Sequence, residues 1–497
     1  MSINQNTVKA VKTDIPARMD RLPWSRWHWL VVISLGITWI LDGLEVTIVG
    51  AIASVLARPD TLHLSDLEAS SAGSVYLIGA VLGALVFGRM TDQQGRKKLF
   101  MITLVIYLSA TIATAFSPNF YWFAVCRFLT GAGIGGEYAA INSAIDELIP
   151  ARARGWTDLA INSTWWIGTV FGALMTGILL NPHLFPVDVG WRLAFGMGAI
   201  LGLGILLVRR YVPESPRWLM MHGRFDEANK IVSGIEHEII TERHGKSLPP
   251  PEGSIYIRPR GSISFGEIIK TMVKHYPKRS ILGLSLMAAQ AFFYNAIFFT
   301  YALVLTTFFH LPAESVPFYQ IPFAIGNIIG PFTIGRLFDT IGRRKMISFT
   351  YITSGVLLAI TSWLFAQGYL NAVTLTICWS IIFFFASTGS SSAYLTVSEI
   401  FPLEVRALVI ALFYAIGTGI GGAFAPFIFG LLIQTRQPTI LAYGYLAGAI
   451  MMALAGVVAI FFGVDAERKS LESIARPFSQ VEEDADSATT PTATQAS

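Results

Sequence analysis

Four ionisable residues lie inside long apolar stretches in the first half of the sequence: Asp42, Glu45, Arg127 and Glu137. An ionisable side chain well inside a membrane span costs ~2.5–3.5 kcal/mol on insertion scales, so it usually faces a cavity or a charged partner. Asp42 and Glu45 are three residues apart and therefore share a helix face. We expect proton chemistry at these four residues. Asp42 and Glu137 are also compatible with binding a solute amine or hydroxyl, or with a neutral carboxyl hydrogen-bonded between helices.

The second half of the sequence has neutral polar and aromatic side chains in its apolar stretches. An amide in hydrocarbon must find hydrogen-bond partners, whereas aromatic side chains in spans are more often packing or interfacial residues. Together with two residues of the first half, they are our candidates for solute binding: Asn162, Trp166, Gln290, Tyr294, Asn295, Asn327, Trp379 and Tyr394. The sequence thus favours charge coupling in the first half and much of the solute binding in the second.

The elements that must position these residues are membrane helices. Of the 497 residues, 53% are hydrophobic and 14% are charged, against about a quarter charged in soluble domains. The apolar runs mostly approach or exceed the ~20 residues that cross a bilayer as a helix. We predict an all-α membrane protein with twelve transmembrane helices, near residues 29–53, 70–90, 99–116, 120–145, 157–180, 191–209, 279–307, 314–337, 345–366, 370–396, 405–434 and 440–464.

The distribution of basic residues predicts the orientation of these spans. Lys and Arg close to spans are retained on the cytoplasmic side; five precede the first span, whereas the opposite loops hold only Arg58, Arg192 and Arg436. We therefore expect both termini in the cytoplasm, and the compact termini and loops suit a bacterial inner membrane. The expected parts are an N-terminal segment 1–28, a six-helix half 29–209, a linker 210–278, a second six-helix half 279–464 and a largely disordered tail 465–497.

An internal repeat relates the two halves. Gly88-Arg-Met-Thr-Asp-Gln-Gln-Gly-Arg-Lys-Lys98 recurs as Gly335-Arg-Leu-Phe-Asp-Thr-Ile-Gly-Arg-Arg-Lys345, 247 residues later. A Glu-x-x-Pro-x-x-x-Arg motif that begins at Glu147 recurs at Glu399, 252 residues later. Two motifs repeated at nearly one spacing indicate a duplication, which in a transporter places the solute between the halves near the bilayer midplane.

The repeated segments hold charged residues that we expect to form a gate on the cytoplasmic side. The two Asp residues can pair with Arg residues and with the positive N-terminal end of a neighbouring helix, while the Glu and Arg residues of the second motif can form ion pairs between the halves. The set is Asp92, Arg96, Glu147, Arg154, Asp339, Arg343, Glu399 and Arg406. The alternative is that these charges only set the orientation of the loops.

The duplicated Gly-Arg-x-x-Asp-x-x-Gly-Arg segments resemble the signature loop of the major facilitator superfamily. Arg127-x-x-x-Gly131-x-Gly133-x-Gly135 and Pro213-Glu-Ser-Pro-Arg-Trp-Leu219 resemble the sugar porter branch. The resemblance implies two six-helix halves that rock around one central site. It also places Glu45 at the position of a carboxylate that works with Arg127, which makes Glu45 our candidate proton carrier. The alternative is a fixed ion pair that only holds two helices together.

Departures from the sugar porter pattern fall where solute specificity would be set. Asn162 stands where those porters carry Gln, and Tyr394 stands where they carry a Trp that contacts sugar, whereas Gln290 and Asn295 keep the Gln-x-x-x-x-Asn spacing. The first span, with Asp42-Gly43-x-Glu45, looks more like the metabolite:proton symporters, including carriers of aromatic and other organic acids. The solute can therefore be a sugar or an organic acid.

We expect a secondary active transporter, a proton symporter of a small polar metabolite, that works by alternating access. A facilitative uniporter or exporter, or a membrane sensor that kept the fold without transporting, are the alternatives. The sequence has no nucleophile with its base, no phosphate loop with a lysine and no cluster of metal ligands, so we predict no enzymatic activity, no cofactor and no metal. The expected partners are a small solute, protons and the lipid bilayer, with no nucleic acid, and we expect a monomer.

Overall fold

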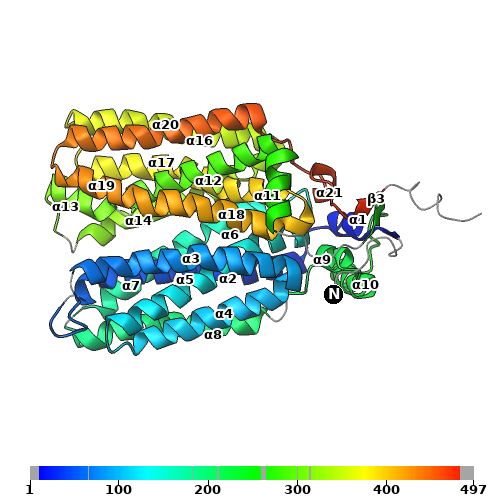
Figure 1. Ribbon diagram of the computed structural model, residues 1–497, viewed down its shortest axis with the longest axis horizontal. Coiled ribbons are helices and arrows are strands. Elements are labelled where there is room, and N and C mark those ends of the chain that lie inside the picture. The colour runs from blue at the N-terminus through cyan, green and yellow to red at the C-terminus, as the bar shows by residue number, and fades with distance from the viewer. Residues whose placement is uncertain are drawn as a thin grey trace, which may run out of the picture.

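Two bundles of long helices lie side by side in the computed structural model, which describes residues 10–56, 58–64, 66–181, 183–209, 212–258, 265–298, 300–312 and 315–481 (Figure 1). The first bundle consists of α2 (Arg26–Leu56), α3 (Asp66–Gln94), α4 (Arg96–Ala115), α5 (Phe120–Leu148), α6 (Arg154–Ser163) with α7 (Trp165–Leu179), and α8 (Val187–Arg209). The second consists of α12 (Pro277–Phe298) with α13 (Tyr301–Phe309), α14 (Val316–Ile334) with α15 (Leu337–Thr340), α16 (Arg343–Ala366), α17 (Ala372–Ile400), α18 (Arg406–Thr418) with α19 (Ala425–Gln434), and α20 (Pro438–Phe462).

The outer faces of both bundles are apolar. Large hydrophobic side chains on them are exposed, among them Ile200 at 68% and Phe461 at 72%. Within the described residues, eight helices are long and apolar enough to cross a membrane by length and composition alone. An apolar surface of this extent fits a lipid environment rather than water.

Three of the spans that we predict as continuous are interrupted. Thr164 separates α6 from α7, and its hydroxyl donates to the carbonyl oxygens of Gly36 and Ile161 at 2.9 and 2.6 Å. A π-helical turn, η3 (Gly419–Phe424), separates α18 from α19, and the predicted span 279–307 is divided into α12 and α13. The break at Thr164 is stabilised by these side-chain hydrogen bonds, which hydropathy does not report. Such breaks lie at functional places in many membrane helices.

Helices α3 and α5 pack closely through glycines. A Cβ atom on Gly79 or Gly83 of α3 would meet the α5 backbone at Phe128 or Ala132, and a Cβ on Gly135 of α5 would meet the carbonyl of Ala80 on α3. Small residues permit such close approach between membrane helices. These glycines therefore allow α3, with its gate residue Asp92, to lie close against α5.

Substituting Gly135 with Ala is expected to destabilise the first bundle, because the new methyl group would overlap the Ala80 carbonyl. Overpacking of this kind costs about 1–3 kcal/mol, so the melting temperature in detergent should fall. Gly204→Ala on α8 is the matched control, since a Cβ there meets nothing within 4 Å. Equal melting temperatures for the two variants would contradict this interpretation of the α3–α5 contact.

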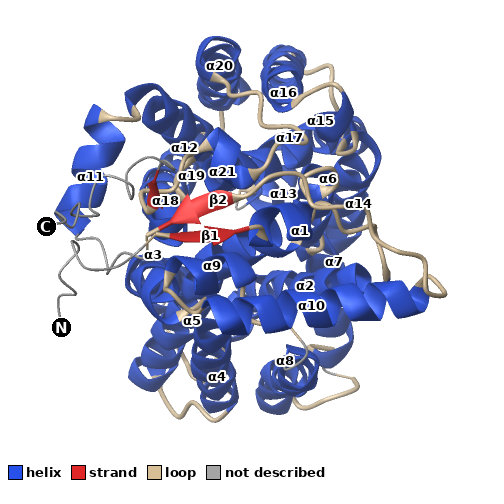
Figure 2. Cartoon of the chain, turned by 90° about the vertical axis from the view of Figure 1, so that its right-hand side faces the viewer, coloured by secondary structure: helices blue, strands red, loops and turns tan. Residues whose placement is uncertain are grey.

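One end of the molecule carries the N-terminal segment, the linker and the tail, and we call it the linker end. A three-stranded antiparallel sheet there has the order β1 (Val11–Thr13), β2 (Ile255–Ile257) and β3 (Gln480–Val481), with Lys12 opposite Tyr256 and Tyr256 opposite Val481. Figure 2 shows the sheet at the centre of this end. The short helices of the same end are α1 (Ile15–Asp20), α9 (Pro216–Met221), α10 (Phe225–Glu242), α11 (Phe265–Lys274), η2 (Leu403–Val405) and α21 (Leu471–Ile474).

The tail differs from our expectation of a largely disordered segment. Residues 465–481 are folded: Leu471 is buried, and Glu472 accepts a hydrogen bond from Arg217 at 3.0 Å. Residues 482–497 lie outside the described residues. The physical reason is that the tail finds buried partners in the linker and the N-terminal segment, which its polar composition does not reveal.

Candidate functional site

Asp42 lies on α2 at the centre of the first bundle and is 3% exposed. Its carboxylate accepts hydrogen bonds from Tyr76 of α3 at 2.9 Å, from Trp165 of α7 at 2.7 Å and from the hydroxyl of Tyr138 of α5. Three donors from three helices satisfy a carboxylate that burial alone would leave costly. Asp42 therefore links α2 to α3, α5 and α7, and movement of any of these helices would change its hydrogen bonds.

Glu45 and Arg127 form an ion pair in which both side chains are fully buried. Arg127 donates to Glu45 Oε1 at 2.6 Å and also to the hydroxyls of Thr114 and Thr130, at 2.9 and 3.0 Å. The guanidinium lies 4.7 Å from the ring centroid of Phe195 on α8. Glu45 Oε2 has no hydrogen-bond partner among the described residues. Arg127 therefore engages the other carboxylate oxygen, Oε1.

Glu137 is also buried, 2% exposed, one residue before Tyr138 on α5. The hydroxyl of Tyr107 on α4 has no hydrogen-bond partner among the described residues and interacts electrostatically with Glu45, Asp42 and Glu137. Asp42 and Glu45 contact different helices. Asp42 contacts α3, α5 and α7, whereas Glu45 contacts α4 and α5. The four predicted ionisable residues lie in one polar region of the first bundle.

Aromatic rings from both bundles meet where the bundles face each other. Tyr138 lies 4.5 Å from Trp39 and 4.8 Å from Tyr414, and Tyr394 lies 6.4 Å from Trp39, measured between ring centroids. Because Tyr138 also donates to Asp42, this aromatic cluster joins the carboxylate to helices α17 and α18 of the second bundle. No sequence signal singles out Trp39 or Tyr138, because aromatic side chains in membrane spans are more often packing or interfacial residues.

The predicted amides occupy the facing side of the second bundle. Gln290 Oε1 accepts a hydrogen bond from Ser390 at 2.7 Å, and Asn327 Oδ1 accepts one from Tyr294 at 2.8 Å. Asn295 donates to the carbonyl of Ala291 on its own helix. Trp166 lies 6.0 Å from Tyr294, which brings α7 of the first bundle against α12.

Two predicted solute-binding residues lie elsewhere. Trp379 is fully buried inside the second bundle, with its ring 5.0 Å from Tyr301 and 6.2 Å from Tyr445, so it does not join the aromatic cluster. Asn162 lies on α6, where its amide donates to Asn142 Oδ1 at 3.3 Å and to the carbonyl of Asp158. Asn162 therefore contacts residues of its own bundle, on α5 and α6.

The eight predicted gate residues meet at the linker end. Asp92 of the first bundle accepts backbone hydrogen bonds from Ala407 and Leu408 at 3.3 and 2.9 Å, at the start of α18. Asp339 of the second bundle accepts them from Gly155 and Trp156 at 3.1 and 2.7 Å, at the start of α6. Each Asp thus caps a helix of the opposite bundle, where the helix dipole favours negative charge.

Ion pairs in the same layer follow the internal repeat. Glu147 accepts from Arg96 of its own bundle at 2.8 Å and lies 3.9 Å from Arg406 of the other. Glu399 accepts from Arg343 of its own bundle at 2.9 Å and lies 3.8 Å from Arg154 of the other. The contacts are buried and cross between the bundles in both directions. In this structure the bundles are therefore closed against each other at the linker end.

Two further carboxylates, which are not among the predicted site residues, lie in this layer. Asp146 and Asp158 are fully buried, and no oxygen of either carboxylate has a hydrogen-bond partner among the described residues. The predicted spans 120–145 and 157–180 place Asp146 and Asp158 at their boundaries. A charged residue at the end of a span is ordinary, so neither Asp indicates a site. The helices extend to Leu148 and begin at Arg154.

The segment Pro213–Leu219 fastens the linker to this layer. Glu214 accepts hydrogen bonds from the backbone N–H groups of Arg96 and Lys97 at 2.9 and 3.2 Å, at the start of α4, and burial raises the pKa of Glu214. Arg217 donates to Asp20, to Glu472 and to the carbonyl of Glu147. Although burial opposes its charge, the pKa of Arg217 is raised because Asp20 and Glu472 are close.

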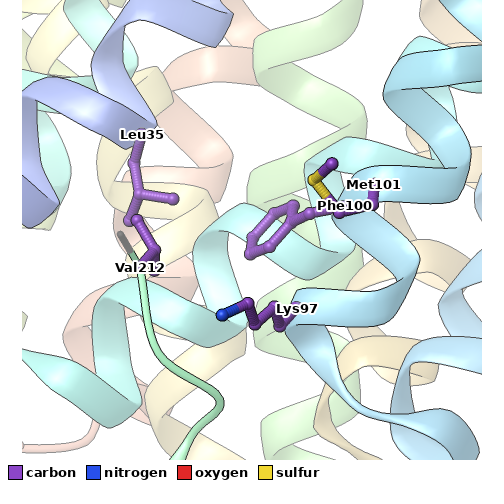
Figure 3. Close-up of a pocket in the computed structure, with 5 residues that line it drawn as sticks. All are labelled: Leu35, Lys97, Phe100, Met101 and Val212. Atoms are coloured by element: carbon purple, nitrogen blue, oxygen red, sulfur yellow. The ribbon is translucent and has the colours of Figure 1, made fainter. Parts of the chain in front are cut away.

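A small recess opens near the linker end (Figure 3). It is lined by Leu35 of α2, by Lys97, Phe100 and Met101 of α4, and by Val212. None of these five residues is among the predicted site residues. The recess is therefore not our candidate for solute binding.

Comparison with known proteins places the chain among transporters. A family model described as "Sugar (and other) transporter" matches residues 26–478. A niacin transporter, NiaP of Acinetobacter baylyi, is 27% identical over 93% of this chain and 99% of its own length. A D-xylose transporter of Levilactobacillus brevis is 26% identical over 71% of this chain and 76% of its own. The solved proton:xylose symporter XylE superimposes with a TM-score of 0.74 at 18% identity, over 90% of this chain and 98% of that one.

Proposed function

The chain belongs to the sugar (and other) transporter family of the major facilitator superfamily, and we propose that it is a proton-coupled symporter of a small polar metabolite. As a member, it is a multi-pass membrane transporter with twelve helices and not an enzyme. The observation that carries the proton coupling is the buried Glu45–Arg127 pair with its unpartnered carboxylate oxygen. A proton on Glu45 would weaken this pair and change the contacts of α2 with α4 and α5.

The solute site that we propose lies between the bundles, at the aromatic cluster and the amides Gln290 and Asn327. Flat aromatic faces suit a ring, and amides and tyrosine hydroxyls suit its polar substituents. Sugars and organic acids both carry these features, and the relatives include proteins named for niacin and for xylose. The carboxylate of Asp42 beside the cluster favours a neutral or protonated solute over an anion.

The linker end is, in our proposal, the cytoplasmic side of a bacterial inner membrane. Basic residues concentrate there in the sequence, and both ends of the described chain, β1 and β3, lie in its sheet. The capped helices and ion pairs would then close the cytoplasmic gate in a state that faces outward. A facilitative uniporter is the second candidate. The observation that favours it is Asp42, because a carboxylate that accepts three hydrogen bonds can stay ionised and need not bind a proton during transport.

The test is binding followed by flux. Purified protein is melted with a panel of neutral sugars and of organic acids at two pH values, since a ligand at a hundred times its dissociation constant adds about 2.7 kcal/mol of stability. The solute that stabilises is then added outside proteoliposomes on which a pH gradient is imposed. We expect the solute to be taken up against its own concentration gradient. In the melting experiment, Gln290→Ala is expected to weaken the stabilisation by the solute. Flux that ignores the pH gradient supports the uniporter, and absence of flux with any solute overturns transport.

A further inference from the structure

Asp158 lies on α6, which packs against α5 of its own bundle and against α14 and α17 of the other. The side chain is 0% exposed, and neither carboxylate oxygen has a hydrogen-bond partner among the described residues. An ionised carboxylate in such a place is strongly disfavoured, because it has lost water. The side chain of Asn162 and the charge of Arg343 offset only part of that loss. Binding a proton removes that cost.

The charges that face Asp158 do not compensate it. They are Asp146 of α5, Glu399 of α17 and Arg343 of α16. The nitrogens of Arg343 are already engaged: Nε and Nη2 donate to Glu399 at 2.9 and 3.0 Å, and Nη1 donates to Asp339 at 2.9 Å. The two facing carboxylates disfavour a further negative charge.

Asp146 differs in this respect. It faces Arg406 and Arg154 in addition to Glu399 and Ser398. The charges of Arg406 and Arg154 partly compensate Asp146, although Nη1 of Arg406 also lies 3.9 Å from Glu147 Oε1. The hydroxyl of Ser398 is engaged with the carbonyl of Leu395 at 2.8 Å. Asp146 is thus the natural comparison for Asp158, because it is equally buried but faces two arginines.

The neighbouring amide supplies an independent indication of a proton. Asn162 Nδ2 donates to Asn142 Oδ1 and to the backbone carbonyl of Asp158, whereas Asn162 Oδ1 has no donor among the described residues. A protonated carboxyl group has an O–H that can donate to such an oxygen. One proton on Asp158 would therefore satisfy two unpartnered groups at once.

We propose that Asp158 is a second proton-binding site, separate from Glu45, which holds its proton while the bundles are closed at the linker end and releases it there when they part. The proposal rests on the alternating access of the proposed function, but not on its solute. Parting of α6 from α14 and α17 would admit water to Asp158 and favour the ionised form. The closed state binds the extra proton, so low pH favours closure and rising pH favours opening.

The experiment measures opening at the linker end without any solute. Cys126 and Cys378 are replaced by Ser, and Ala407, which is fully buried on α18 where that helix packs on α3, is replaced by Cys as the reporter. Labelling by a soluble maleimide is followed from about pH 5 to about pH 9, which brackets a perturbed carboxyl group. Because only the thiolate reacts, each rate is divided by the rate for the denatured protein at the same pH, and labelling is given as this ratio. One coupled proton changes the ratio of open to closed protein by up to about tenfold per pH unit.

We expect labelling to rise with pH in the parent protein, to stay low and flat in Asp158→Asn, and to regain its pH dependence in Asp158→Glu. Asp146→Asn should keep a rise of labelling with pH, displaced to lower pH because one of the carboxylates facing Asp158 is removed. The infrared carbonyl band of a protonated carboxylic acid should be weaker in Asp158→Asn than in the parent at low pH. An unchanged slope or an unchanged band in Asp158→Asn overturns the proposal, as does a slope lost only in Asp146→Asn. Because no solute is used, this labelling result does not depend on the transport experiment, and the two proposals can fail separately.

Discussion

Glu45→Gln is expected to abolish proton-driven accumulation of the solute while leaving solute exchange across the membrane intact. Gln keeps the shape of a protonated Glu but cannot release a proton, so Arg127 would be left without its ionised partner. One proton that crosses 100 mV supplies about 2.3 kcal/mol, enough for roughly fifty-fold accumulation of a neutral solute. Proteoliposomes with an imposed pH gradient measure the accumulation, and counterflow of labelled solute measures exchange.

The control for this experiment is Glu227→Gln, which removes an exposed carboxylate paired with Arg224 on the linker. Its accumulation should equal that of the parent. Loss of an ionised partner also strains the buried Arg127, so the melting temperature of each variant is recorded to confirm that it is folded. Concentrative uptake by Glu45→Gln at the parental level would refute Glu45 as the carrier and support a fixed ion pair.

The double variant Asp92→Asn with Asp339→Asn is expected to shift the protein towards the state open at the linker end. Each Asp caps a helix of the opposite bundle through two backbone N–H groups. Hydrogen bonds to charged groups contribute about 1.5–3 kcal/mol, so each substitution should raise the open fraction by about tenfold or more. Labelling of a cysteine at Ala407 reports the shift.

The matched control is Asp60→Asn at the opposite end, where Asp60 forms an exposed pair with Arg58. Surface pairs contribute about 0–1 kcal/mol, so labelling should not change. If the double variant labels as slowly as this control, the repeated Asp residues do not hold the gate closed, and their charges serve only to orient the loops. A single Asp variant that gives the full effect would show that the two caps are unequal.

The helices of this protein could be predicted from the sequence because their apolar runs are long and local. The internal repeat predicted which gate residues correspond. Each half carries one Asp motif and one Glu-x-x-Pro-x-x-x-Arg motif, so the two copies are expected to meet in one layer and to make equivalent contacts. The sheet could not be predicted in this way. Its strands have two or three residues and join positions 11–13, 255–257 and 480–481, so no local pattern exists to detect them. The folded part of the tail was missed for the same reason.

The sequence predicts which polar residues lie inside the spans, but it does not predict which residues they contact. Asp42 could be recognised as an intramembrane acid, whereas its three donors come from helices distant in sequence. Trp379 has the residue type of a stacking platform but lies inside one bundle against Tyr301. Asp158 was missed because a shift of a few residues in a helix boundary decides whether a charge is interpreted as a loop residue or as a buried one.

The order of the strands has a consequence for biosynthesis. The central strand β2 pairs on one side with β1, from the beginning of the chain, and on the other with β3, from near its end. One edge of β2 therefore stays unpaired until translation has passed residue 481. The sheet closes only after all the membrane helices have been made, and a chain truncated before Gln480 would leave an open strand edge of the kind that quality-control factors and other chains recognise.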